Sequence, residues 1–528
     1  MEAGQMLSTN TLWEVAANKL DTWVMENLQP STDFTKNVKD TVDKICTFLK
    51  ESCFEKDIRV QKTVKGGSAG KGTALKNNSD ADVVLFINYF SSYHVQKQNR
   101  ERLRILDLIK QRLEQKERLD FTVSITEPRY KGPNNAPRSL SFTLYSNSES
   151  IEVDILPAYD ALGNVKRDDP PDPNVFVGLL DIGSSPGEFS PCFTELQKMF
   201  VKRCPAKLKN LVRLVKHWYK EMVKPQHPNE HLPPKYALEL LTIYAWEEGT
   251  GSSDSFVTAE GFRTVLELLC QHQKICIYWE KFYSLKDNRT GDHVKRLLGS
   301  PRPVILDPAD PTGILGQGTR WDLLAREAAS YSAQLPCIKH VRPWAVQPAR
   351  PVEIEVRQLT GIRLSKTVSP SITIWQLKEE IEKVCGISPH RQRLAWQEAG
   401  RTTVVLQDSE TLATHGIFYN TMLSLLQIEP KEMEIFVKGN QTTTYRVLPT
   451  LTVLQLKEMI HRQRGPPPPQ QRLQYDSQEL EDQHTLAHYR VQPRSTIYLL
   501  GKLRGGSGPL PSPCVQPHEG LLPTVFPG

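Results

Sequence analysis

Two short stretches in the first hundred residues carry side chains that could do chemistry. Residues 65–73 read KGGSAGKGT and residues 79–82 read SDAD. Glycines let backbone N–H groups approach a phosphate closely. Asp80 and Asp82 are two residues apart, so on a strand they share a face and repel each other unless a cation lies between them. Oxygen ligands of this kind suit Mg²⁺, and the combination predicts a site that handles a nucleotide.

Two predicted strands must position these carboxylates. The apolar run at residues 83–87 (VVLFI) predicts a buried strand directly after Asp82. Residues 151–157 (IEVDILP) alternate between apolar and acidic side chains, which predicts a second strand with Glu152 and Asp154 on one face. Either carboxylate could complete a metal site with the first pair, and spacing alone does not choose between them.

The residues around these strands are mostly helical in pattern. Apolar residues recur at helical spacing in residues 1–62 and again at 99–115, while residues 63–160 supply the strands of the sheet. Residues 161–192 are rich in Pro, Gly and Asp and are predicted to form a connecting loop. Residues 193–350 return to a helical pattern.

A basic segment at residues 195–224 is predicted to form a charged helical face. It contains only Glu195 and Glu221 as acids. Its cations are Lys198, Lys202, Arg203, Lys207, Lys209, Arg213, Lys216, Lys220 and Lys224. A charge run is often just a solvated helix face, but nearly uniform sign over this length costs self-repulsion, which favours a polyanion as partner.

Further along, two features have both a structural and a functional interpretation. Tyr236 lies in the first turn of a predicted helix at residues 232–246, where it could stack on a base or fill the core. Asp307 and Asp310 each precede a proline, which is ordinary turn chemistry, although aspartates can also bind metal.

Composition excludes several classes of protein. The 528 residues are too many for one compact domain, and three or four units are expected. No run of 18 apolar residues predicts a membrane span, and the first residues do not resemble a signal peptide. Nine scattered cysteines indicate reduced thiols rather than disulfides or zinc, and we expect a cytoplasmic or nuclear protein. The net charge of +6 is mild, so any nucleic-acid face must be local.

An internal repeat lies beyond a boundary near residues 343–351. Residues 374–396 recur at 453–475, a shift of 79 residues, with matching Gln-Leu-Lys and Gln-Arg-Leu triplets. Both copies resemble ubiquitin, the second more closely, and its Leu-Arg-Gly-Gly motif ends at Gly506. We expect ubiquitin-like domains at 352–429 and 433–506 and a disordered, proline-rich tail at 507–528.

The catalytic pattern also resembles a known family. Gly67-Ser68, eleven further residues and then Asp80-Ala81-Asp82 resemble the polymerase-β-type nucleotidyltransferases, whose third carboxylate falls on Asp154. The motifs at 192–197 (CFTELQ), 214–219 (LVKHWY), 236–241 (YALELL) and 305–311 (ILDPADP) then make the chain similar to the 2′-5′-oligoadenylate synthetase-like proteins. The resemblance implies an α+β fold. A bilobal nucleotidyltransferase at 1–350, with a sheet-bearing lobe at 1–160 and a helical lobe at 193–350, would precede two ubiquitin-like β-grasp domains.

The resemblance also implies an activity and its residues. Double-stranded RNA would activate the joining of ATP into 2′-5′-linked oligoadenylates, with release of pyrophosphate, in interferon-type antiviral defence. Two Mg²⁺ ions would be held by Asp80, Asp82 and Asp154. ATP would contact Gly67, Ser68, Arg213, Lys216, Lys235 and Tyr236. RNA would contact Lys65, Lys71, Lys198, Lys202 and Lys207, read by shape with little sequence preference.

Three departures from the family pattern bear on this expectation. Ala206 replaces a usual threonine in the RNA-binding run, and Lys235 replaces a usual glutamine near the adenine. Residues 337–339 read CIK where the family has the Cys-Phe-Lys associated with oligomerisation. Some members with tandem ubiquitin-like domains have lost the carboxylates and are inactive, whereas this chain keeps all three.

The alternative function is that of a signalling adaptor, in which the synthetase fold only senses RNA and the ubiquitin-like domains bind a protein partner. Non-covalent binding is expected, because Gly506 is followed by 22 more residues and lacks the free carboxylate that conjugation needs. The positions of the apolar docking patch of ubiquitin fall on Asn440, Gln474 and Leu500. Two of these are polar, so we expect common ubiquitin receptors to bind poorly.

Overall fold

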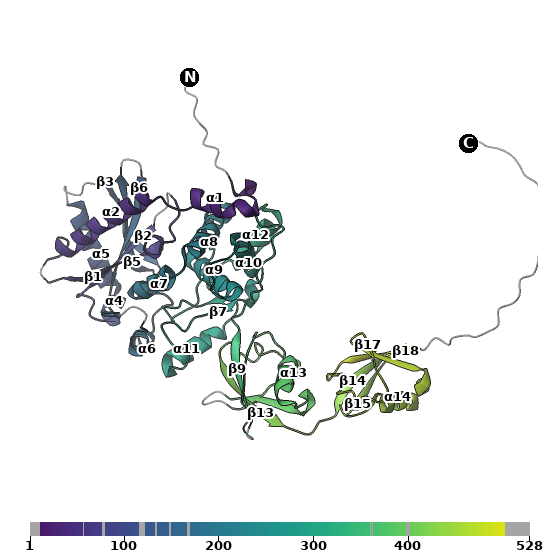
Figure 1. The fold of residues 1–528 in the computed structure, drawn as a ribbon. Coiled ribbons are helices and arrows are strands. Elements are labelled where there is room, and N and C mark those ends of the chain that lie inside the picture. Colours follow the sequence, from purple (N-terminus) through teal and green to yellow (C-terminus); the bar gives the residue numbers. More distant parts are fainter. Residues whose placement is uncertain are drawn as a thin grey trace, which may run out of the picture. The chain divides into compact units, whose positions relative to one another are not determined.

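The structure is a computed structural model (Figure 1). It describes residues 11–501 except 56, 77–79, 116–121, 132–134, 147–148, 166–168, 359–360, 362 and 398–401. The described residues divide into two compact units, and the residues of the first predicted ubiquitin-like domain are shared between them. The domain boundaries at 350, 429 and 506 therefore stay predictions. The predicted tail at 507–528 and the Gly505-Gly506 motif lie outside the described residues.

A six-stranded sheet forms the centre of the N-terminal part, with the order β1-β2-β6-β5-β3 and with β4 paired to β5. Its strands are β1 (Val60–Gly66), β2 (Asp80–Ile87), β3 (Thr122–Ile125), β4 (Arg129–Lys131), β5 (Ala136–Ser146) and β6 (Glu149–Ala158). The central pair, β2 and β6, runs parallel, while β1 and β5 flank it antiparallel. The two strands predicted to hold carboxylates are thus direct neighbours.

The alternation of side chains along β2 and β6 decides which face carries chemistry. Val83, Leu85, Val153 and Ile155 point into a hydrophobic core. That core is built with helices α2 (Thr32–Glu51) and α5 (Asn99–Glu114), which cover this face of the sheet (Figure 1). Because successive strand residues alternate, Asp82 and Asp154 are directed to the opposite face.

Helices form most of the rest of the N-terminal part. They are α1 (Leu20–Asn27), α3 (Gly67–Lys71), α4 (Tyr93–Lys97), α6 (Pro173–Asp181), α7 (Thr194–Lys202), α8 (Ala206–His217), α9 (Lys235–Thr250), α10 (Thr258–Cys270), α11 (Asn288–Leu298) and α12 (Trp321–Gln334). The strands β7 (Cys276–Ile277) and β8 (Val304–Ile305) form a short parallel pair. The helical pattern predicted for residues 193–350 is confirmed.

Two predictions about this part were wrong in detail. Residues 161–192 do not form a loop throughout, because Asp172 caps the N-terminus of α6 and Pro173 occupies its first turn. The basic segment 195–224 is not one helix. Pro205 separates α7 from α8, since proline lacks the N–H that a continuous helix needs, and a π-helical turn at Trp218–Val223 follows α8.

The C-terminal residues form two small mixed folds of the β-grasp kind that the sequence predicts. The first contains β9 (Val352–Gln358), β10 (Arg363–Val368), α13 (Ile374–Cys385), β11 (Gln392–Trp396), β12 (Val404–Val405) and β13 (Thr421–Gln427). The second contains β14 (Met433–Lys438), β15 (Thr442–Val447), α14 (Val453–Arg462), β16 (Gln471–Tyr475), β17 (Gln478–Glu479) and β18 (Thr496–Gly501). In the second, β14 pairs antiparallel with β15 and parallel with β18, and the helix packs on the sheet through Leu456 and Ile460.

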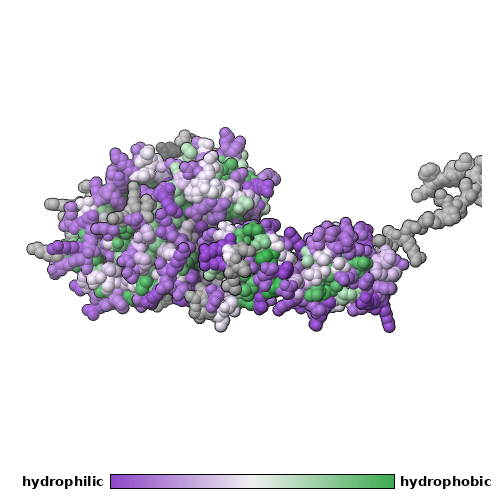
Figure 2. Space-filling model, turned by 60° about the horizontal axis from the view of Figure 1, so that its bottom comes forward, coloured by the Kyte–Doolittle hydropathy of each residue, from purple (hydrophilic) through white to green (hydrophobic). Residues whose placement is uncertain are grey.

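The surface of the molecule is mostly hydrophilic on the face drawn in Figure 2, with hydrophobic residues gathered in small patches. Among the residues that the structure describes, no helix is long and apolar enough to cross a membrane.

Candidate active site

A cavity of about 450 Å³ lies where the carboxylate face of the sheet meets α3 and α9. It brings together seven of the residues predicted to bind metal or ATP. Its lining consists of Gly67, Ser68, Lys71, Ala81, Asp82, Arg129, Glu152, Asp154, Lys216, Lys235, Tyr236 and Glu239. Three carboxylates and Arg129 come from the strands, whereas three lysines and Glu239 come from α3, α8 and α9, so acidic groups outnumber basic ones at one end and basic groups outnumber acidic ones at the other.

The acidic end is built by strand register. Asp82 pairs with Asp154 and Asp80 with Glu152 between the parallel strands β2 and β6. The Ser141 hydroxyl donates a hydrogen bond to Asp154. The Arg129 guanidinium lies 2.7 Å from Glu152 and 3.9 Å from Asp154. A cation already lies beside these carboxylates, which is what clustered negative charge requires.

The donor set at this end fits magnesium. Carboxylate oxygens at the edge of a nucleotide cavity are the ligands that Mg²⁺ takes in phosphate-handling sites. Asp82 and Asp154 line the cavity together, whereas nothing is described of the Asp80 side chain. Within the described part of the chain, no group of three His, Cys, Asp or Glu residues forms a metal cluster, and the predicted triad with Asp80 falls outside that search.

The glycine-rich stretch forms a short helix, α3. Gly67 begins α3 with φ of 63°, and Gly72 ends it with φ of 81°, a left-handed conformation that favours glycine. A Cβ on Gly70 would lie 2.3 Å from the Lys65 carbonyl oxygen, so this position also requires glycine. The glycines let α3 turn tightly between β1 and β2, which places Ser68 at the cavity.

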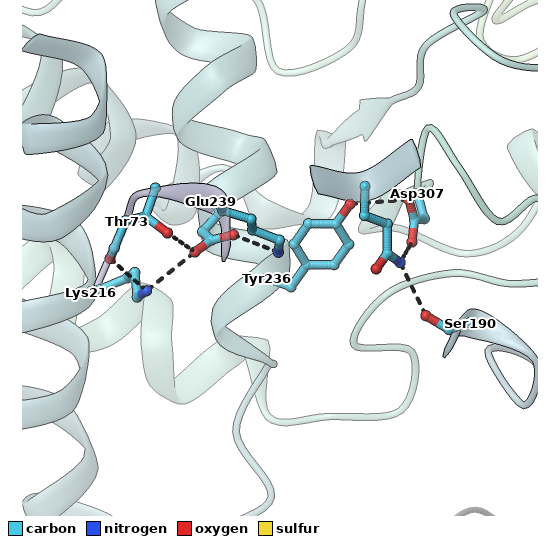
Figure 3. A network of polar contacts seen from close by, with 8 residues as sticks. Thr73, Ser190, Lys216, Tyr236, Glu239 and Asp307 are labelled. Carbon is cyan, nitrogen blue, oxygen red and sulfur yellow. Dashed lines mark hydrogen bonds and ion pairs between the residues drawn. The ribbon is translucent and has the colours of Figure 1, made fainter. Parts of the chain in front are cut away.

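The cationic end is organised by a buried carboxylate that sequence reasoning missed. Glu239 is 4% exposed. Its Oε1 accepts from the Thr73 hydroxyl at 3.0 Å and from the Lys216 ammonium at 3.2 Å, and its Oε2 accepts from the Lys71 ammonium at 3.1 Å (Figure 3). Burial alone would raise the pKa of Glu239, but the ammonium groups of Lys71 and Lys216 outweigh it and lower this pKa to about 2.

Tyr236 joins this end of the cavity to a second buried network. Its hydroxyl donates to Asp307 at 3.1 Å, and the Gln197 amide donates to the same carboxylate at 2.6 Å and to Ser190 at 3.0 Å (Figure 3). Burial and nearby Asp310 raise the pKa of Asp307 to about 6. Tyr236 is therefore held with its ring at the cavity.

Asp307 and Asp310 act as the turn residues that the sequence favoured over metal ligands. Asp307 accepts from the backbone N–H of Ala309, and Asp310 accepts from that of Thr312. Both are nearly fully buried, which surface turn chemistry would not predict.

Sequence could have revealed Glu239, because Tyr236 and Glu239 lie three residues apart and share one face of α9.

Arg213 and Lys216 hold the chain between α3 and β2. Arg213 donates to the backbone carbonyls of Gly72 at 2.6 Å and Ala74 at 2.8 Å, and Lys216 donates to that of Thr73 at 3.0 Å. Of these two predicted triphosphate contacts, Lys216 lines the cavity, while Arg213 lines a different, larger one. Both cations thus hold residues 72–74, which follow α3.

The larger cavity, of about 1020 Å³, holds most of the predicted RNA-binding lysines. Lys65, Lys198 and Lys202 line it. Burial first, and then the charges of Lys202 and Lys65, lower the pKa of Lys198, as expected for cations held close together. We call this larger cavity the lysine groove. It shares Ala81 and Asp82 with the smaller cavity, so the two adjoin at the start of β2.

The other two predicted RNA contacts lie elsewhere. The Lys207 ammonium pairs with Asp21 at 3.3 Å and lies 5.2 Å from the ring centroid of Phe256. Lys71 lies in the smaller cavity, paired with Glu239. Spacing along the sequence does not distinguish these lysines, because the direction of each side chain depends on the packing of α3 and α8.

Comparison with known proteins gives matches along most of the chain. Four family models match in succession: a nucleotidyltransferase domain at residues 45–139, the C-terminal domain 2 of 2′-5′-oligoadenylate synthetase 1 at 169–349, a ubiquitin-like domain at 351–423 and the ubiquitin family at 435–504. The mouse 2′-5′-oligoadenylate synthase-like protein 2 is 40% identical over 503 residues, covering 93% of this chain and 98% of that protein. The chain belongs to the 2′-5′-oligoadenylate synthetase family.

Other members of the family match different lengths of the chain. The rat 2′-5′-oligoadenylate synthase-like protein 1 is 37% identical over 525 residues and is covered completely. Human 2′-5′-oligoadenylate synthase 2 is 46% identical over 350 residues, which are 63% of this chain and 48% of that protein. The predicted family and the predicted fold class, a nucleotidyltransferase followed by two ubiquitin-like domains, are confirmed.

The Glu239 network predicts a pH-dependent stability. The folded-state pKa of Glu239, about 2, lies below the ordinary 4.5, so its stabilisation is present above pH 4.5 and is lost as pH falls toward 2. Glu239→Gln should lower the free energy of unfolding by about 3 kcal/mol at pH 7, because two buried ammonium groups lose their anion. Urea midpoints of both proteins should converge as pH falls from 6 to 3. A difference between them that does not change with pH would contradict the assigned charge state.

Proposed function

We propose that this protein synthesises 2′-5′-linked oligoadenylates from ATP, releases pyrophosphate and is activated by double-stranded RNA in antiviral defence. The observation that carries the proposal is the smaller cavity, where Asp82 and Asp154 face Ser68, Lys216 and Tyr236 across one space. Family membership supports the reaction class, since the chain matches a nucleotidyltransferase domain and the synthetase domain together.

The arrangement suits the transfer of a nucleotidyl group. Carboxylates at one end would hold Mg²⁺ through Asp80, Asp82 and Asp154, and bound Mg²⁺ would lower the pKa of the attacking 2′-hydroxyl and stabilise the leaving pyrophosphate. Lys216 and Lys235 at the other end supply positive charge for a triphosphate, and Gly67 leaves room for backbone N–H groups to approach it. The ring of Tyr236 offers a surface for adenine.

The lysine groove provides the proposed RNA site. Lys65, Lys198 and Lys202 line this groove together. Burial and the neighbouring charges of Lys202 and Lys65 lower the pKa of Lys198, and a bound polyanion would offset that repulsion. Because the groove and the smaller cavity share Asp82, RNA bound in the groove would act directly on the strand that carries the metal ligands. We propose that this contact brings the carboxylates into catalytic geometry. The same proposal places the protein in the cytoplasm or nucleus, where such RNA is met.

One assay tests the proposed activity. Purified full-length protein should convert ATP and Mg²⁺ into 2′-5′-linked oligomers when double-stranded RNA is added, and much more slowly without it. The linkage is checked by digestion with a 3′-5′-specific nuclease, which should leave the product intact. RNA binding without any product would instead favour the adaptor function.

A specific observation keeps the adaptor function as a second candidate. On the second ubiquitin-like domain, Tyr498 is 46% and Leu500 40% exposed on neighbouring outward positions of β18. Gln474 pairs with Tyr498 in the β16–β18 register. The face is therefore less polar than Asn440 and Gln474 alone suggested, and it offers a protein partner an aromatic and an aliphatic side chain side by side.

The C-terminal domains are predicted to act without conjugation. Gly506 is followed by 22 residues, so no free terminal carboxylate is available for activation. Cells that express the protein are digested with a protease that cuts only after lysine, which would leave residues 503–506 on a modified lysine. Mass spectrometry of these digests should show no isopeptide between Gly506 and a lysine. A chain truncated at Gly506 serves as the matched control for detection. An isopeptide formed by the full chain would contradict this prediction.

A further inference from the structure

Lys71 occupies the smaller cavity with two protein partners. Its ammonium lies 3.1 Å from Glu239 Oε2 and 3.9 Å from the centroid of the Tyr236 ring. The Lys71 side chain is only 12% exposed. In this arrangement the ammonium covers the aromatic surface that a nucleobase would need, through a cation–π contact. A base cannot lie on that face of Tyr236 until Lys71 moves.

Several cations lie around the single carboxylate of Glu239. Lys71 and Lys216 both pair with it, and Lys235 lines the same cavity. The positive charge at this end therefore exceeds the negative charge that Glu239 supplies. A triphosphate carries more negative charge than one carboxylate, so it can compete for these ammonium groups.

Glu239 has other hydrogen-bond donors that stabilise its carboxylate when Lys71 leaves. If Lys71 leaves, Glu239 still accepts from the Thr73 hydroxyl and the Lys216 ammonium. The carboxylate is then not left buried and unpaired, which would be strongly unfavourable. Lys71 is the last residue of α3 and reaches the cavity by a flexible side chain, while Thr73 and Lys216 are fixed by the backbone contacts described above.

We propose that Glu239 is a positioning residue for the nucleotide: it holds Lys71 across Tyr236 before a nucleotide binds and releases Lys71 to the incoming triphosphate. The proposal rests on the proposed function, because it takes ATP as the ligand of this cavity. The exchange uncovers Tyr236 for the base and carries an ammonium to the phosphates in one movement. Lys216 stays with Glu239 and keeps Thr73 in place.

The first experiment measures binding without catalysis. The Kd of α,β-methylene-ATP, in which the bond broken in transfer is replaced, is determined with Mg²⁺ and without RNA on the full chain. Glu239→Gln should bind about tenfold more tightly, because both lysines lose their competing anion. Glu239→Asp, which restores the charge, should return toward the wild-type value. Glu248→Gln is the matched control, since Glu248 lies on the same helix but pairs with Arg350 at 3.6 Å.

A second variant keeps the proposal testable if Glu239→Gln does not fold. Lys71→Gln leaves the Glu239–Lys216 pair intact and uncovers the ring of Tyr236. It should bind adenosine several-fold more tightly and α,β-methylene-ATP several-fold more weakly than the wild type, because the base gains a surface and the phosphates lose a cation. A merely structural role for Lys71 would move both constants in the same direction.

The outcomes separate this proposal from the proposed function. The positioning role is overturned if Glu239→Gln binds α,β-methylene-ATP no more tightly than the wild type. It is also overturned if Lys71→Gln changes the Kd of adenosine and of α,β-methylene-ATP in the same direction. Either result counts even if the wild type makes oligoadenylates. If Lys71→Gln shows the expected opposite shifts in Kd but the wild type makes no product, the exchange is supported and only the proposed synthesis is rejected.

Discussion

Replacing Asp154 with alanine is expected to reduce RNA-stimulated oligoadenylate synthesis by at least about a thousandfold, since a lost metal ligand removes several kcal/mol of transition-state stabilisation. Asp154 lies beside Asp82 in the β2–β6 register and lines the cavity. The initial rate of ATP conversion at saturating RNA is the measurement. RNA binding and the circular dichroism spectrum should stay unchanged, because β6 is held by its core side and not by this carboxylate. We expect the same losses for Asp80→Ala and Asp82→Ala.

Glu152 is the matched control for this prediction. It lies two residues away on the same face of β6, and its side chain is 49% exposed and paired with Arg129. Glu152→Ala should lower the rate only a few-fold. If Asp154→Ala keeps substantial activity while Glu152→Ala loses it, the third metal ligand has been assigned to the wrong carboxylate.

Reversing the charge of Lys198 and Lys202 together is expected to weaken binding of double-stranded RNA by about a hundredfold or more at physiological salt, because two phosphate contacts become repulsive. Both side chains line the lysine groove beside Lys65. The slope of log K against log salt should become shallower by about two, one unit for each lysine that no longer contacts a phosphate. RNA-stimulated synthesis should fall in parallel, while binding of α,β-methylene-ATP without RNA stays unchanged.

A double reversal at Lys220 and Lys224 gives the control with the same change in net charge. Lys220 already pairs with Glu221 at 3.2 Å and lines a cavity separate from the lysine groove. This variant should retain RNA binding within a few-fold. The groove is not the RNA site if reversal at Lys198 and Lys202 leaves the RNA-stimulated rate at its original value. Lys207→Glu adds a useful comparison, because Lys207 pairs with Asp21 outside the lining of the groove.

The sequence alone determined the elements and the chemistry that depend on local spacing. Alternation of apolar and acidic residues at 151–157 fixed the face of Asp154, since a strand has a period of two. The apolar run at 83–87 fixed the strand after Asp82 in the same way. The repeat of residues 374–396 at 453–475 was enough to predict two separate C-terminal folds, because each copy carries a complete hydrophobic pattern.

Only the tertiary structure decided which distant side chains meet. That Asp82 lies beside Asp154 follows from the parallel pairing of β2 with β6, which no local pattern encodes. Glu239 accepts hydrogen bonds from Thr73, Lys71 and Lys216 because α9 packs against the segment after α3 and brings these three donors to one buried carboxylate. The lysines of one basic segment were likewise separated into different environments by Pro205 and by helix packing. Spacing along the sequence predicts the side of a helix or strand on which a charged residue lies. The element that packs against that side supplies the residue's partner. Where the pair is buried, the charge of the partner then determines the pKa of the residue.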